Sequence, residues 1–244
     1  MSNKVALVTG GAKGIGRAIA LDLAATGWDV AICYRTSAKA ASEVIDQVKR
    51  SGVSGLAIEC DVSNADAAVR LVQRVQQEFG RIDALINGAG PYHRVSLLNE
   101  TNEGWHSMFD NNLHPVFYLT QAVIPIMKQQ KWGRIVSFSM ANAEQLIAQP
   151  QLTAHYITKV GLLALSRSFA KLIAPDGITM NCVSPGFIDS GSAPKEELDK
   201  MVKFIPAGYV GSMTDAVAVV RFLLSDDARY VNGANIQLSG AWGV

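Results

Sequence analysis

The chain has 244 residues, 49% of them hydrophobic, and a formal net charge of +1. The hydrophobic content is sufficient for a well-buried core and excludes an intrinsically disordered chain. The balanced charge argues against nucleic acid or an anionic membrane as a partner, and no apolar run reaches the roughly 18–20 residues that a membrane span needs.

Strand-like and helix-like segments alternate from the N-terminus onward. Met1-Ser-Asn-Lys4 leads directly into a strand without the pattern of a signal peptide, so we expect a cytoplasmic protein. Short apolar runs predict strands, and helical spacing between them predicts helices that include 15–26 and 38–50. The predicted strands cover 5–9, 29–34, 56–60, 84–87, 134–138, 178–183 and 235–238.

Fully apolar short strands separated by helices are typical of a parallel sheet covered on both faces. Right-handed crossovers then give a doubly wound sheet. No linker, repeat or low-complexity stretch divides the chain, so we predict an α/β fold with a single Rossmann-type domain over residues 1–244. The glycine- and proline-rich stretch 186–212 is the least regular part and is predicted to form a lid over the site.

A glycine-rich turn connects the first predicted strand to the first predicted helix. Gly10, Gly14 and Gly16 lie in Thr9-Gly-Gly-Ala-Lys-Gly-Ile-Gly16, where glycines allow a tight turn and close approach of the backbone to a diphosphate. The N-terminus of the following helix adds free N–H groups and a positive dipole end. This pattern predicts a dinucleotide-binding site.

The end of the second strand distinguishes NADP(H) from NAD(H). An acidic residue there would bind the ribose 2′-hydroxyl and repel a 2′-phosphate. This chain has Cys33-Tyr34-Arg35 and no carboxylate. Arg35 can clamp a phosphate with its planar guanidinium, and Lys13 can reach the same anion. We therefore predict NADP(H) as the cofactor.

Further motifs follow in order over the whole chain. The chain resembles the short-chain dehydrogenase/reductase family in its glycine spacing and in the motifs Asn87-Gly-Ala-Gly90, Asn112 and Lys159-Val-Gly-Leu162. Its C-terminal part looks most like the bacterial 3-oxoacyl-carrier-protein reductases. The resemblance implies that the protein reduces a small carbonyl substrate with NADP(H). A 3-oxoacyl thioester is one candidate for that substrate. It also implies a homotetramer or homodimer built on helices near 104–129 and 153–174.

The resemblance further implies which residues contact the cofactor. Asp61 and Val62 match the pair that holds the adenine, and Pro185-Gly186 through Ser190 match the nicotinamide contact. The full set of expected cofactor-binding residues is Gly10, Lys13, Gly14, Ile15, Gly16, Tyr34, Arg35, Asp61, Val62, Asn87, Ala89, Lys159, Pro185, Gly186, Ile188 and Ser190.

The catalytic segment departs from the family pattern. The family places a tyrosine four residues before the lysine, where it donates a proton to the carbonyl oxygen. Here His155 is four residues before Lys159, and Tyr156 is three residues before it. Either His155 donates the proton, or the first helical turn shifts and brings Tyr156 into place. A different alternative is a catalytically weakened NADP(H)-binding protein that acts as a sensor or partner subunit.

The family's serine has no clear counterpart either. Counting from Arg134 reaches Met140, next to Ser139, whereas counting thirteen residues back from His155 reaches Asn142. The loop 140–154 is therefore expected to carry about two extra residues, and Ser137, Ser139 and Asn142 all remain candidates. Asn112 matches the family's helix asparagine. The expected catalytic residues are Asn112, Ser139, His155, Tyr156 and Lys159.

Overall fold

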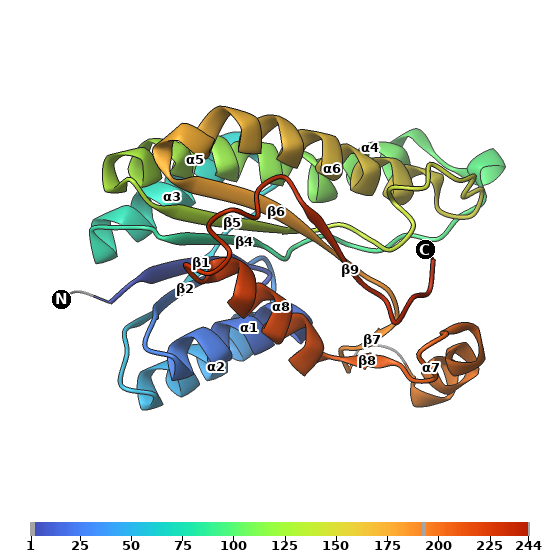
Figure 1. Ribbon diagram of the computed structural model, residues 1–244, viewed down its shortest axis with the longest axis horizontal. Helices are drawn as coiled ribbons and strands as arrows, with labels where there is room; N and C mark the ends of the chain where they lie inside the picture. The colour runs from blue at the N-terminus through green and yellow to red at the C-terminus, as the bar shows by residue number, and fades with distance from the viewer. Residues whose placement is uncertain (1–2, 192–193, 244) are drawn as a thin grey trace.

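A seven-stranded sheet with the order β3-β2-β1-β4-β5-β6-β9 forms the centre of the computed structural model, which describes residues 3–191 and 194–243 (Figure 1). Every pair of neighbouring strands is parallel. The strands are β1 (Val5–Thr9), β2 (Asp29–Tyr34), β3 (Gly55–Glu59), β4 (Ala84–Asn87), β5 (Gly133–Phe138), β6 (Ile178–Pro185) and β9 (Asn235–Leu238).

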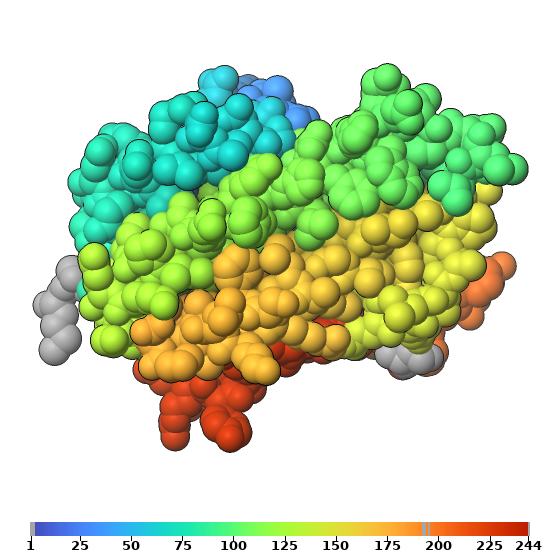
Figure 2. Space-filling view, turned by 90° about the horizontal axis from the view of Figure 1, so that it is seen from above, coloured from blue at the N-terminus to red at the C-terminus, as the bar shows by residue number. Residues whose placement is uncertain are grey.

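Helices cover both faces of this sheet. One face carries α1 (Gly14–Ala25), α2 (Ala38–Arg50) and α8 (Met213–Leu224), and the other carries α3 (Ala65–Phe79), α4 (Asn102–Asn112), α5 (His114–Gln130) and α6 (Thr153–Ile173). Seen from above, α3, α5 and α6 form successive bands across the second face (Figure 2). No helix in the described ranges is both long and apolar enough to cross a membrane.

The alternation of side chains along each strand divides the core in two. In β1, Ala6 and Val8 pack with the α1, α2 and α8 layer, whereas Val5 and Leu7 pack with the α3, α5 and α6 layer. Because both faces are covered, all five residues of β1 are buried. This explains why the strands read as mostly apolar runs in the sequence, and it confirms the predicted doubly wound α/β fold.

The predicted strands agree with the structure to within two residues at each end. The stretch 186–212 is more regular than predicted, because it contains α7 (Lys195–Met201) and a small parallel sheet of β7 (Ile188–Asp189) and β8 (Gly211–Ser212). In Figure 1, α7 stands apart from the sheet layers. Three short 3-10 turns complete the described elements, at Leu97–Asn99, Ala174–Asp176 and Val202–Phe204.

A buried ion pair fixes the amino-terminal edge of the sheet. The Asp83 carboxylate accepts hydrogen bonds from Val5 N at 2.8 Å and from Arg81 Nε at 2.8 Å and Nη2 at 2.7 Å. The Asp83 side chain is 1% exposed and that of Arg81 is 33% exposed. The pair therefore connects β1 to the start of β4 in a place where an unpaired carboxylate would be costly.

We predict that Arg81→Ala lowers the free energy of unfolding by about 2–4 kcal/mol, because the Asp83 carboxylate stays buried without its cation. Urea denaturation measures this change. Arg74→Ala is the matched control, since the Arg74–Glu78 pair is exposed on α3 and should change stability by about 0.5 kcal/mol or less. Equal effects of the two substitutions would contradict this account.

Candidate active site

The turn between β1 and α1 has the geometry that a diphosphate requires. Gly10 and Gly14 have φ of 66° and 53°, in the left-handed region that favours glycine. A β-carbon on Gly16 would lie 2.5 Å from the Gly10 carbonyl oxygen. Lys13 at the N-cap of α1 makes no side-chain capping hydrogen bond, so the first helical N–H groups are left for an anion. The turn fits the diphosphate of a dinucleotide.

Thr9 holds this turn against the end of β4. Its Oγ1 accepts hydrogen bonds from Gly88 N at 3.1 Å and Ala89 N at 3.2 Å and donates one to Ile86 O at 3.4 Å. Asn87 is buried beside them, and its Nδ2 donates to Ser137 Oγ at 3.1 Å. These bonds place the carboxyl ends of β1, β4 and β5 in register around the turn.

A cavity beyond the glycine turn has the residues expected for an adenosine site. Tyr34, Arg35, Asp61 and Val62 all line it, together with Gly10 and residues 88–91. Arg35 Nη1 donates to Asn111 Oδ1 at 3.1 Å. The pKa of Asp61 is lowered, mainly by the hydrogen bond from the Ser63 hydroxyl and to a smaller degree by the Arg35 charge. Arg35 thus has the position predicted for it.

Lys13 does not line the adenosine cavity. It is exposed at the start of α1, so the structure places only Arg35 of the two predicted phosphate ligands at the cavity wall. Ile188 and Ser190 also lie outside both cavities described here, although a β-carbon on Gly14 would come within 3.8 Å of Ser190 Cβ. The segment after β6 therefore lies across the glycine turn.

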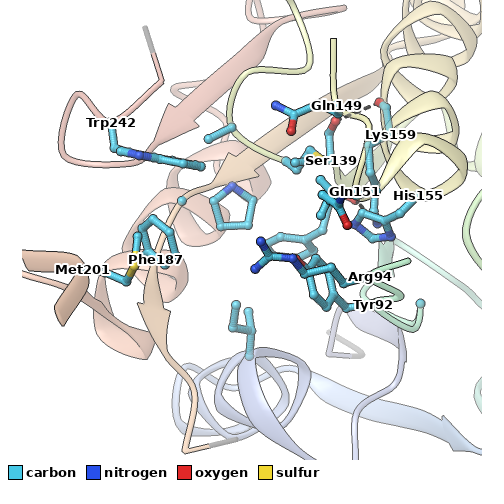
Figure 3. A pocket seen from close by; sticks show the side chains of 18 of the residues that line it. Tyr92, Arg94, Ser139, Gln149, Gln151, His155, Lys159, Phe187, Met201 and Trp242 are labelled. Carbon is cyan, nitrogen blue, oxygen red and sulfur yellow. Dashed lines mark hydrogen bonds between the residues drawn. The ribbon is translucent and has the colours of Figure 1, made fainter. Parts of the chain in front are cut away.

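A second cavity of about 650 Å³ opens at the carboxyl edge of the sheet (Figure 3). It shares residues 88–90 with the adenosine cavity, so the two cavities adjoin along one edge of the sheet. Of the predicted cofactor residues, Ile15, Ala89, Lys159, Pro185 and Gly186 line it. A nicotinamide dinucleotide bound along this edge would span both cavities.

His155 and Lys159 lie one turn apart at the start of α6, and both line the larger cavity. Burial lowers the pKa of His155 to about 4, with a further lowering by the Lys159 charge. Burial also lowers the pKa of Lys159 to about 8, and its Nζ donates to Phe138 O at 3.0 Å. At neutral pH the imidazole is therefore neutral and the ammonium is still largely protonated.

Tyr156 lies outside this cavity, since neighbouring helical residues project about 100° apart. Its hydroxyl donates to Asn142 O at 3.0 Å and accepts from Ile147 N at 3.1 Å. The side chain is buried, and the first turn of α6 is not shifted, since Tyr156 N bonds to Leu152 O at 2.8 Å. Of the two candidates left open by the sequence, the structure brings only His155 to the cavity.

Three residues were candidates for the position of the family's serine, and of these only Ser139 lines the cavity. Its Oγ donates to Lys159 O at 2.8 Å. Ser137 is fully buried within β5, and Asn142 is buried in the following loop with φ of 69°. Asn112 is also buried; its Nδ2 donates to Pro91 O at 3.2 Å and Met108 O at 3.1 Å, and its Oδ1 has no partner.

Sequence reasoning missed the residues that form the outer walls of the cavity. Most of them come from connections without a periodic pattern, whose only sequence signal is their position after a strand end, and two lie in the stretch 186–212 that was predicted only as a whole to cover the site. These residues are Tyr92, Arg94, Gln149, Gln151, Phe187, Met201 and Trp242. Within the described ranges, no group of histidine, cysteine and acidic side chains could hold a metal ion.

Comparisons with known proteins agree with this geometry. A family model described as enoyl-(acyl carrier protein) reductase matches residues 10–241. The 3-oxoacyl-[acyl-carrier-protein] reductase FabG of Staphylococcus aureus is 37% identical over 97% of both chains, and that of Synechocystis is 34% identical over 98% of this chain and 97% of the relative.

A solved structure shows the same architecture. A short-chain dehydrogenase of Burkholderia cenocepacia, crystallised in complex with NADP, superposes with a TM-score of 0.92 and 31% identity over 100% of this chain and 99% of that one. The family match, the full-length relatives and the shared fold together show that this chain belongs to the short-chain dehydrogenase/reductase family.

Proposed function

We propose that this protein is an NADP(H)-dependent oxidoreductase that reduces a carbonyl substrate. The observation that carries the proposal is the pair of adjoining cavities beside the glycine turn, one lined by Arg35 and the other by His155 and Lys159. The names of the reductase relatives and the NADP complex of the structural neighbour support it. A 3-oxoacyl thioester, the substrate class in the relatives' names, is one carbonyl compound to test.

The bound cofactor would supply a hydride to the carbonyl carbon, and a proton must then reach the carbonyl oxygen. His155 stands where the family has its tyrosine, and its low pKa leaves the imidazole neutral at pH 7, with a single N–H that it can donate either to the Pro91 backbone or to a substrate. Lys159 carries the nearby ammonium proton. We propose that the His155 imidazole orients and polarises the carbonyl while Lys159 supplies the proton, directly or through the imidazole.

A catalytically weakened NADP(H)-binding protein is the second candidate. Two observations favour it: His155 is neutral at neutral pH, and the Tyr156 hydroxyl is already engaged with Asn142 and Ile147. General acid catalysis usually contributes about 10²–10⁴-fold, so a poor donor would slow turnover by a comparable factor. Tight NADPH binding without turnover of ketones or acyl thioesters would favour this candidate.

We further propose a homotetramer or homodimer built on α4, α5 and α6. Apolar side chains are exposed on the outer surface of two of these helices: Phe117 on α5 is 39% exposed, and Ile157 and Leu172 on α6 are 39% and 70% exposed. Apolar side chains of this size are common at the contacts of symmetric oligomers. Sedimentation velocity distinguishes these assemblies from a monomer.

We expect NADPH to bind about tenfold to a hundredfold more tightly than NADH, because Arg35 makes a charge-assisted contact with the 2′-phosphate. Arg35→Asp should erase or reverse this preference in titration calorimetry. Arg50→Asp, at the exposed end of α2, is the matched control and should leave it unchanged. Equal wild-type affinities for the two cofactors would refute the assignment.

We expect His155→Ala to lower kcat/KM for carbonyl reduction by about 10²–10⁴-fold, since it removes the group that contacts the carbonyl oxygen. Tyr156→Phe should retain most of the activity and instead lower stability by about 1–3 kcal/mol, because Ile147 N and Asn142 O lose their partner. Steady-state kinetics and thermal unfolding measure both. Loss of activity in Tyr156→Phe with His155→Ala still active would reverse the assignment.

The pH profile separates the two proton sources. If the Lys159 ammonium is the source, kcat/KM for reduction is level near neutral pH and falls above the lysine pKa of about 8, because deprotonation removes the acid. If the His155 imidazolium were the source, kcat/KM would already fall from its pKa of about 4 upward. We expect the first profile; a steady decline from mildly acidic to neutral pH would contradict it.

A further inference from the structure

The larger cavity carries positive charge without a balancing carboxylate. Arg94 and Lys159 both line it, and no aspartate or glutamate does so within the part of the chain that the structure describes. Most of the remaining wall is apolar or aromatic. A cavity of this kind favours an anionic group attached to an apolar body.

Arg94 lies on the outer wall, in the irregular segment between β4 and the turn at Leu97–Asn99. Figure 3 shows its side chain beside Tyr92, with the guanidinium directed toward the middle of the cavity. The Tyr92 ring in turn meets the His155 ring edge to face, with centroids 5.3 Å apart. Arg94 is therefore two residues from a side chain that touches the proposed reaction centre.

No described residue neutralises Arg94 through an ion pair or hydrogen bond. The carboxylate of the same connection, Glu100, is already occupied: its Oε1 lies 3.2 Å from His93 Nε2 and accepts from Thr101 N at 3.1 Å. The Glu100 side chain is only 8% exposed. The pairing of His93 with Glu100 keeps the only acidic group of this connection away from the guanidinium.

The segment that carries Arg94 is attached to a neighbouring connection. Leu97 N donates to Pro150 O at 2.8 Å, which joins it to the loop that brings Gln149, Gln151 and Leu152 into the cavity. A guanidinium held on a braced wall loses less freedom when it binds an anion than one on a free loop. This attachment makes Arg94 suitable as a fixed recognition group.

Lys159 is less suited to bind a second anionic group. Its Nζ is buried and donates to Phe138 O, beside the place where the carbonyl would react. Opposite Arg94, Phe187 and Trp242 pack with centroids 4.7 Å apart and, with Met201, form an apolar wall. The lining thus holds two kinds of polar group, His155 and Lys159 at the proposed reacting end and Arg94 on the outer wall, and most of the remaining lining is apolar.

We propose that Arg94 determines specificity by binding a carboxylate on the carbonyl substrate, so that the preferred substrates are compact oxo acids. This inference rests on the proposed carbonyl reduction, whose substrate class it narrows. The planar guanidinium can form two parallel hydrogen bonds to a carboxylate, and a neutral ester, amide or thioester at the same place would leave it unpaired.

Equilibrium binding tests the inference without turnover. The probes are 4-phenylbutanoate and 4-phenylbutanamide, an unreactive pair that shares one apolar body, titrated by calorimetry with and without NADPH. We expect the wild-type protein to bind the carboxylate about tenfold to a hundredfold more tightly than the amide. Arg94→Gln should abolish this preference, Arg94→Lys should retain part of it, and Arg50→Gln should leave it unchanged.

Turnover provides the second measurement. The wild-type kcat/KM for 4-oxo-4-phenylbutanoate should exceed that for its methyl ester by about tenfold to a hundredfold. In Arg94→Gln the two values of kcat/KM should be equal, while the affinity for NADPH is retained. Equal binding of acid and amide by the wild type, or an acid preference that persists in Arg94→Gln, would overturn the inference. Absence of NADPH binding or of any reduction would instead reject the proposed function. The phenylbutanoate titration would still test the role of Arg94, because it does not depend on turnover.

Discussion

The structure depends on the burial of both faces of a parallel sheet. Because helices cover both faces of the sheet, a cavity can open to solvent only at the edge where the strands end. Thr9 makes this edge continuous, because its hydroxyl joins the end of β1 to residues 88–89 after β4. The glycine turn, the adenosine cavity and the larger cavity all lie along this edge.

Two neighbouring residues in the first turn of α6 point in different directions and make different contacts. His155 faces the cavity, whereas the next residue, Tyr156, has its hydroxyl bonded to backbone groups of the 140–152 connection. The tyrosine therefore braces the loop that forms one wall, while the histidine lines the cavity at the proposed reaction centre.

Burial and positive charge together explain the electrostatics of the site. Desolvation lowers the pKa of both His155 and Lys159, and the lysine charge lowers that of the histidine further. The two groups therefore separate into a neutral imidazole and an ammonium near neutral pH. The same positive cavity, with Arg94 on its outer wall, favours a substrate that brings its own negative charge.

The sequence by itself determined the strand order in the chain, the glycine turn and the choice of Arg35 over an acidic residue, because these follow from local patterns of apolar residues, glycines and charge. Only the tertiary structure showed that His155 rather than Tyr156, and Ser139 rather than its neighbours, line the cavity, since the direction of a side chain depends on how α6 and the preceding loop pack. Arg94 carried no sequence signal beyond its position after a strand end. Its role arises because two connections, distant in sequence, meet through the bond from Leu97 N to Pro150 O.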